Sequence, residues 1–168
     1  DKNNIKIIQK LIENNFLSTI IHGSCGSGKT SLISVIVNEY FNNNVQKYSE
    51  NIINITLLKD QGINFYKNDL KNFCNSYCSN SYKKFVIIED IELFSEQVII
   101  YFYNLIIKYK ESINFILSTN DLLKINNNII DILDVIHLKE IDYNILNKIL
   151  EKIIINEKLT LNSDIKEY

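Results

Sequence analysis

The chain contains no arginine, alanine, proline, methionine or tryptophan, and only four glycines and three cysteines among its 168 residues. All 18 basic residues are lysines and the net charge is −2, so any DNA contact would need a local basic patch. Three cysteines do not make a disulfide framework, and the longest apolar stretch, residues 98–107, is too short to cross a bilayer. Without an initiator methionine or a signal peptide, the chain is expected to be a piece of a longer, soluble intracellular protein with no membrane partner.

Isoleucine, asparagine, lysine and tyrosine fill the chain instead, which is the bias that an AT-rich genome imposes. The asparagine clusters at residues 42–44 and 126–128 are therefore expected to be loops rather than prion-like tracts. The length fits one main domain that can bury a sizeable core.

Three of the four glycines fall in one stretch, Gly-Ser-Cys-Gly-Ser-Gly-Lys-Thr-Ser at residues 23–31, which fits the Walker A pattern G-x-x-x-x-G-K-[ST]. An apolar run at residues 18–22 precedes it as a strand should. In such a P-loop, backbone N–H groups surround phosphate, Lys29 reaches the β- and γ-phosphates, and Thr30 offers its hydroxyl to Mg²⁺. The alternative is a glycine-rich loop with a chance lysine. The residues expected to bind nucleotide are Gly23, Ser24, Cys25, Gly26, Ser27, Gly28, Lys29, Thr30 and Ser31.

Apolar periodicity predicts helices that alternate with strands. Helices are expected at residues 5–12, 30–41, 65–74 and 95–109 and from residue 142. Strands are expected at residues 18–22, 52–57, 85–88, 113–118 and 134–138. Residues 60–62 are expected to form a turn, and residues 162–164 to cap the start of another helix. This alternation is typical of a three-layer α/β sandwich around a five-stranded parallel sheet. The helical tail after Ile141 is expected to begin a separate helical domain.

Polar side chains follow two of the predicted strands. Glu89-Asp90 after residues 85–88 has the form of a Walker B element, in which one carboxylate holds Mg²⁺ and the next polarises the attacking water. We assign Glu89, with Thr30, to the metal and Asp90 to catalysis. Asn120, at the end of the next strand, is expected to lie beside the γ-phosphate and orient water. An ordinary cap or turn is the alternative for each of these residues.

The remaining cysteines and histidines give weaker signals. Cys74 and Cys78 are spaced as zinc ligands can be, but no second pair lies near them, and Cys25 is expected to be a small space-filling residue that alkylation can reach. His22 and His137, each at the end of a predicted strand, are expected to be structural.

The order of the P-loop, Glu89-Asp90 and Ser118-Thr119-Asn120 resembles that of an AAA+ ATPase, and the segments between them resemble small subunits of the replication factor C clamp loader. Residues 55–74 are similar to that family's L-N-x-S-D-x-R-G-I…R-x-x-I-K-x-F-A stretch. The spacing of residues 89–120 matches D-E-A-D to R-F-I-L-x-C-N without a gap, and residues 146–159 resemble the first lid helix.

The resemblance implies an AAA+ nucleotide-binding core at residues 1–140 and the beginning of a helical lid domain at residues 141–168. It implies a subunit that binds ATP and Mg²⁺ in a hetero-oligomeric ring of clamp-loader subunits and loads a sliding clamp on primer–template DNA, in the nucleus or another replication compartment. Lys67 and Lys71 match basic positions that face the DNA, although a solvated helix face is the alternative.

The chain departs from this family where arginines are expected. The trans-acting arginine falls on Ile132, and the Leu-Arg-Arg of the central helix falls on Phe102-Tyr103-Asn104. Because lysine does not reproduce the fork of an arginine finger, and Glu89-Asp90 reverses the usual acidic order, we expect slow hydrolysis. A degenerate scaffold subunit with little or no ATPase, and another AAA+ ATPase such as a replication-origin initiator, are the alternatives.

Overall fold

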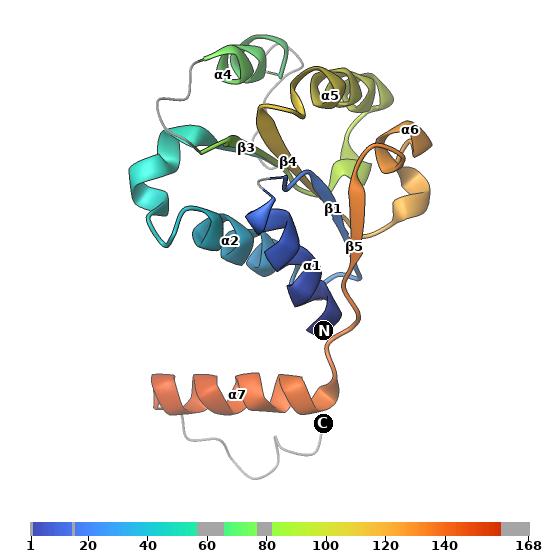
Figure 1. The fold of residues 1–168 in the computed structure, drawn as a ribbon. Coiled ribbons are helices and arrows are strands. Elements are labelled where there is room, and N and C mark those ends of the chain that lie inside the picture. Colours follow the sequence, from blue (N-terminus) through green and yellow to red (C-terminus); the bar gives the residue numbers. More distant parts are fainter. Residues whose placement is uncertain (1, 15, 57–65, 77–81, 159–168) are drawn as a thin grey trace.

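A computed structural model describes residues 2–14, 16–56, 66–76 and 82–158 (Figure 1). The strands are β1 (Thr19–His22), β2 (Ile52–Ile55), β3 (Lys84–Ile88), β4 (Ile113–Thr119) and β5 (Asp134–His137). The helices are α1 (Lys2–Glu13), α2 (Lys29–Tyr40), α4 (Lys71–Asn75), α5 (Glu96–Tyr109), α6 (Asn127–Ile130) and α7 (Tyr143–Glu157). Shorter helical turns are η1 (Val45–Asn51), η2 (Tyr66–Leu70), η3 (Ile91–Leu93) and η4 (Leu122–Lys124).

The five strands form one sheet in the order β2-β3-β4-β1-β5, and every neighbouring pair is parallel. The predicted five-stranded parallel sheet is therefore confirmed. Strand β4 lies between β1 and β3, and its Leu117 is the register partner of both Ile20 and Ile88. The carboxyl ends of these three strands consequently reach the same edge of the sheet, where ligands bind in open α/β folds.

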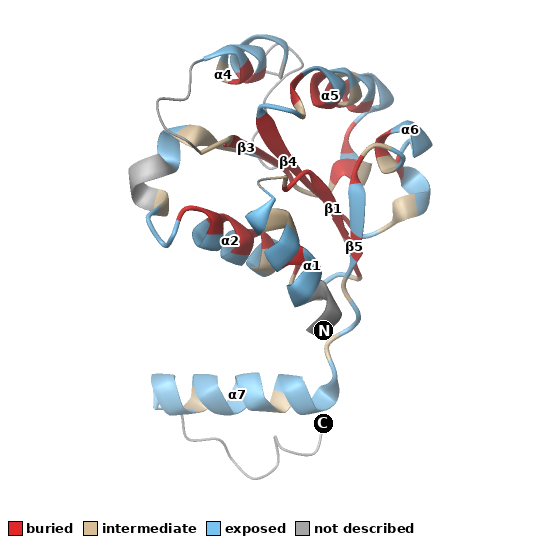
Figure 2. Cartoon of the chain, in the orientation of Figure 1, coloured by how far each residue is buried: buried red, intermediate tan, exposed pale blue. Residues whose placement is uncertain are grey.

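Helices cover both faces of the sheet, with α1 and α2 on one side and α4, α5 and α6 on the other (Figure 1). Successive residues of a strand point to opposite faces. Ile20 thus packs in the core under α5, whereas its neighbour Ile21 packs in the core under α2. Both residues are fully buried, and buried residues follow β1, β3 and β4 along the centre of the molecule (Figure 2). The predicted three-layer sandwich is confirmed.

Some local predictions need correction. The cluster at residues 126–128 is not simply a loop, because the Asn126 side chain accepts a hydrogen bond from the Asn128 N–H at 2.9 Å and caps helix α6. The helix predicted at residues 65–74 is found over residues 66–75, but its first part is the π-helical turn η2, which continues directly into the short helix α4. The predicted turn at residues 60–62 and the cap at residues 162–164 lie outside the described residues.

Helix α7 begins after Asp142, as predicted, but none of its residues is buried. Its apolar side chains at Ile145, Ile149 and Ile153 are between 44% and 51% exposed. Figure 2 shows this helix mostly exposed, with intermediate stretches and no buried one, and set apart from the sheet. An amphipathic helix normally buries its apolar face, so the sheet's core is built without α7.

Candidate nucleotide-binding site

The loop between β1 and α2 has a backbone that only glycine adopts easily. Gly26 and Gly28 have φ angles of 78° and 90°, and Gly28 is the N-cap of α2. At Gly23 the constraint is space, because an added Cβ would lie 2.6 Å from Ser27 Oγ and 2.9 Å from the carbonyl oxygen of Leu138. The N-terminus of α2 is therefore presented at the sheet edge, with the N–H groups of its first turn available to an anion.

Lys29 lies at the mouth of this loop and is only 8% exposed. Its ammonium group donates hydrogen bonds to the carbonyl oxygens of Gly23 at 2.9 Å and Ser24 at 3.0 Å, and to Asn120 Oδ1 at 2.7 Å. The third bond joins the loop to the end of β4, which neighbours β1 in the sheet. All three acceptors are neutral, so no carboxylate among the described residues competes with an anionic ligand for this ammonium group.

Thr30, the next residue, contacts the end of β3. Its hydroxyl donates to Glu89 Oε2 at 2.8 Å, and the Glu89 N–H donates to the carbonyl oxygen of Ile55 at 3.0 Å. The two side chains predicted to share a metal ion are thus adjacent. Hydroxyl and carboxylate oxygens are the donors that Mg²⁺ prefers, so this pair fits such an ion.

Asp90 and Asn120 meet across the ends of β3 and β4. Asp90 has a φ angle of 49°, in the left-handed region, and its N–H donates to Ser118 Oγ at 3.1 Å. Asn120 Nδ2 donates to Asp90 Oδ1 at 3.2 Å. The structure therefore brings the two predicted catalytic residues into contact, with Lys29 on the other side of the Asn120 amide.

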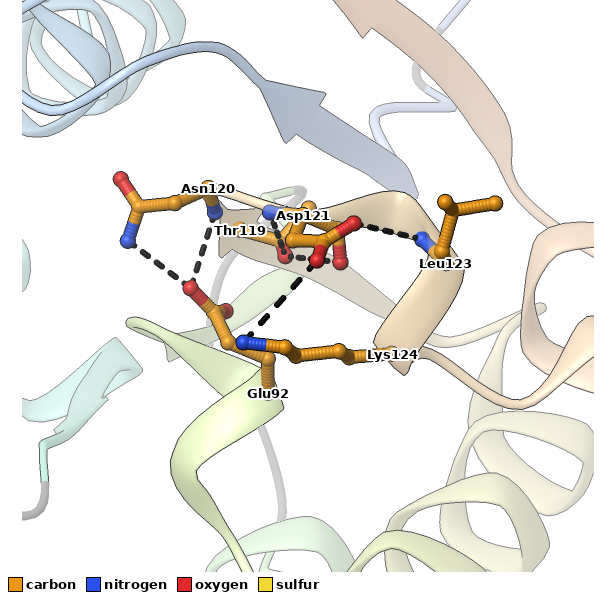
Figure 3. Close-up of polar contacts among 6 residues, drawn as sticks. All are labelled: Glu92, Thr119, Asn120, Asp121, Leu123 and Lys124. Carbon is orange, nitrogen blue, oxygen red and sulfur yellow. Dashed lines mark hydrogen bonds and ion pairs between the residues drawn. The ribbon is translucent and has the colours of Figure 1, made fainter.

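Glu92 is a site residue to which the sequence assigned no role. Its Oε1 accepts hydrogen bonds from the Asn120 backbone N–H at 2.9 Å and from Asn120 Nδ2 at 2.8 Å (Figure 3). Burial alone would raise the pKa of Glu92, but these hydrogen bonds outweigh it and hold the pKa below its usual value. The signal in the sequence was its place at the last acidic position of the stretch that matches D-E-A-D, but the turn η3 that folds it back towards β4 was not predicted.

Asp121 fixes the chain just after β4. Its side chain accepts from the Leu123 N–H at 3.0 Å and lies 3.9 Å from the ammonium group of Lys124 (Figure 3). The ordinary turn that was the alternative for Asn120 is therefore formed by Asp121. The Asn120 side chain instead accepts a hydrogen bond from Lys29 of the P-loop.

The two histidines are paired with each other. His22 and His137 are register partners on β1 and β5, and their Nδ1 atoms lie 3.0 Å apart. The Leu138 N–H donates to the His22 carbonyl oxygen at 2.7 Å, which continues the ladder past both residues. The pair therefore ties β5 to the strand that leads into the P-loop.

The remaining predicted residues lie elsewhere. Lys67 and Lys71, on η2 and α4, are exposed on the side of the sheet that α4 and α5 cover. Cys25 is exposed, whereas burial raises the pKa of Cys74 to about 11, with Lys84 and Lys108 partly opposing the rise. Cys78 lies outside the described residues, and in the described part of the chain no group of three or more histidine, cysteine or acidic side chains could hold a metal ion.

The positions that match the family's trans-acting arginines carry no cation. Ile132 and Tyr103 are partly buried and pack against the core, and Asn104 is exposed on α5. Within the described ranges, no helix is long and apolar enough to cross a membrane.

The chain is similar to proteins of known sequence and structure. A candidate replication factor C small subunit, R395, of Acanthamoeba polyphaga mimivirus is 26% identical over 140 residues, which are 83% of this chain and 43% of that protein. AMPPCP-bound DnaA from Aquifex aeolicus superposes with a TM-score of 0.67 at 18% identity, covering 95% of this chain and 52% of that one. A DNA polymerase III gamma subunit-related protein from Thermotoga maritima gives 0.66 at 18% identity, covering 88% and 49%.

The two solved structures share the fold, and the chain spans about half the length of each of these relatives. Residues 19–141, from the first residue of β1 to just before α7, match the model of the AAA family, the ATPase family associated with various cellular activities. The chain therefore belongs to the AAA family of ATPases.

Proposed function

We propose that this chain binds ATP with Mg²⁺ through residues 23–31. The observation that carries the proposal is the convergence of Lys29, the Thr30–Glu89 pair and the Asp90–Asn120 pair at the edge where β1, β3 and β4 end. A buried ammonium group, a helix N-terminus and a glycine-rich backbone beside each other are the elements that bind a polyphosphate.

The same residues support a metal ion beside the phosphates. Thr30 and Glu89 would hold Mg²⁺, which neutralises charge on the phosphate oxygens when it is bound. Ser27 Oγ is buried without a hydrogen-bond partner in the described part of the chain, which leaves one more polar group of the loop available to a ligand. Asp90 and Asn120 would orient water at the phosphate end.

The test of nucleotide binding is Lys29→Ala, measured by calorimetry with MgATP. We expect at least about a tenfold loss of affinity, because a hydrogen bond to a charged group contributes about 1.5–3 kcal/mol. Lys124→Ala is the matched control: among the described residues this exposed lysine makes a 3.9 Å ion pair with Asp121, and its loss should leave the affinity unchanged. Equal affinity of Lys29→Ala and the parent, with circular dichroism confirming the fold, would reject the proposal.

We further propose that the chain is an ATP-binding subunit of a clamp loader, which acts with other subunits in a hetero-oligomeric ring to place a sliding clamp on primer–template DNA. The name of the viral relative supports this role, and the exposed Lys67 and Lys71 are the proposed DNA contacts. Residues 1–140 would form the nucleotide-binding core, and residues 141–168 would begin a helical lid, consistent with the unburied apolar face of α7. Mixing the chain with candidate subunits and measuring ATPase stimulation by clamp and primed DNA tests the assignment.

A degenerate scaffold subunit is the second candidate. It is favoured by the reversed order of Glu89 and Asp90 and by Ile132 at the position of the missing arginine. Such a subunit would hold its ring neighbours together and bind nucleotide poorly. The same calorimetric titration separates the two candidates, because only the ATP-binding subunit binds nucleotide tightly.

A further inference from the structure

Glu92 accepts two hydrogen bonds from a single residue, Asn120, and neither bond is needed to complete a strand or a helix. We propose that Glu92 is a positioning residue that holds the Asn120 carboxamide with its oxygen towards Lys29. Asn120 would then present a hydrogen-bond acceptor, and not a donor, at the phosphate end of the site. This inference rests on the proposed nucleotide binding.

The hydrogen bonds of Asn120 determine which way its amide faces. The NH₂ group has two hydrogens, and acceptors stand at 2.8 Å on Glu92 and at 3.2 Å on Asp90. The amide oxygen then lies 2.7 Å from the Lys29 ammonium group. Turning the amide by half a rotation would place NH₂ against the ammonium and the oxygen against two carboxylates, so all three contacts would become repulsive.

Glu92 makes the stronger of the two carboxylate contacts. Its bond to Nδ2 is shorter than that of Asp90, and the same Oε1 also receives the Asn120 backbone N–H, which ties down the chain where β4 ends (Figure 3). The left-handed backbone of Asp90 lets the following turn bring Glu92 back to this point. Oε2 of Glu92 is buried without a hydrogen-bond partner among the described residues, a cost that the bonds at Oε1 help to offset.

The orientation of the amide decides what Asn120 can do. Phosphate oxygens are acceptors, so an amide oxygen that faces them binds Lys29 or a water O–H rather than the phosphate itself. If Glu92 is removed, Lys29 and Asp90 still hold the amide, but the NH₂ hydrogen that Glu92 had bound is freed and can donate to the terminal phosphate. Affinity for ATP should then rise relative to ADP, which has no terminal phosphate at that place.

The experiment compares MgATP and MgADP affinities by calorimetry for the parent, Glu92→Leu, Asn120→Ala and the double variant. We expect Glu92→Leu to raise the ratio of ATP to ADP affinity about threefold to tenfold, the net size of one ordinary hydrogen bond. In the Asn120→Ala background the same substitution should change the ratio much less, because only the general loss of a negative charge remains. Glu92→Gln, which keeps one acceptor oxygen, should give an intermediate ratio.

Glu96→Leu, on the exposed first residue of α5, is the matched control for charge removal and should leave the ratio unchanged. An unchanged ratio in Glu92→Leu, or an equal change with and without Asn120, would overturn the inference. If the parent binds neither nucleotide, the proposed function fails, and the Asn120 side-chain amide signals in a ¹⁵N spectrum decide about Glu92 alone. A shift of one Asn120 NH₂ proton signal and its faster exchange with solvent in Glu92→Leu support the Glu92 hydrogen bond, and unchanged signals reject it.

Discussion

Replacing Gly28 by alanine measures how much folding free energy is lost when a residue other than glycine adopts this P-loop backbone conformation. Gly28 has φ 90° and ψ 22°, and a Cβ added there meets nothing within 4 Å. The substitution therefore causes no clash, and its whole effect on the folded state comes from forcing an L-residue into the left-handed region.

The expected change in the free energy of unfolding is the difference between two opposing effects, strain in the folded backbone and reduced freedom of the unfolded chain. A residue other than glycine loses about 1–2 kcal/mol in this region, and a φ of 90° lies beyond its centre, so the upper figure applies. Alanine also restricts the unfolded chain, which returns about 0.4–1 kcal/mol of stability. The free energy of unfolding should fall by about 1–1.5 kcal/mol, and the melting temperature by about 2–6 °C for a chain of this size.

Urea denaturation and a thermal scan measure this loss, with Gly28→Asn as the matched variant. Asparagine tolerates the left-handed region, and this chain itself places Asn42 and Asn43 at φ angles of 50° and 60°. Stability should therefore decrease in the order glycine, asparagine, alanine. An alanine variant as stable as the parent, or more stable than the asparagine variant, would refute the backbone argument.

Three further predictions concern catalysis and pH. Ile132→Ala should leave the ATPase of an assembled complex almost unchanged and cost only packing energy, since this position carries no cation; a tenfold fall in rate would contradict this. The double substitution Glu89→Asp and Asp90→Glu should raise the single-turnover rate in a complex whose neighbour supplies an arginine, and a lower rate would show that the reversed order is the functional one. Burial would raise the pKa of Glu92, yet hydrogen bonds from Asn120 hold it below 4.5; its stabilising effect is thus complete above about pH 4.5 and is lost as the pH falls through the lower folded value. The free energies of unfolding of Glu92→Gln and the parent should converge in acid, and a constant gap would exclude this linkage.

Patterns among residues close together in the sequence were sufficient to predict the P-loop and most of the sheet. The glycine spacing at residues 23–31 favours a backbone with positive φ angles, which Gly26 and Gly28 adopt. The apolar run at residues 85–88 predicted a strand buried on both faces, since only such a strand avoids polar residues throughout. These features depend on residues that are close along the chain, so the sequence alone determines them.

The tertiary structure decided which distant residues meet. Periodicity does not reveal that β4 lies between β1 and β3, and this placement brings Asn120 to Lys29, 91 residues away in sequence. The orientation of the Asn120 amide depends in turn on Glu92, whose position comes from a left-handed residue that is not glycine. No short-range pattern encodes such contacts, because each is stable only when the packed sheet holds both partners and excludes the water that would otherwise compete for their hydrogen bonds.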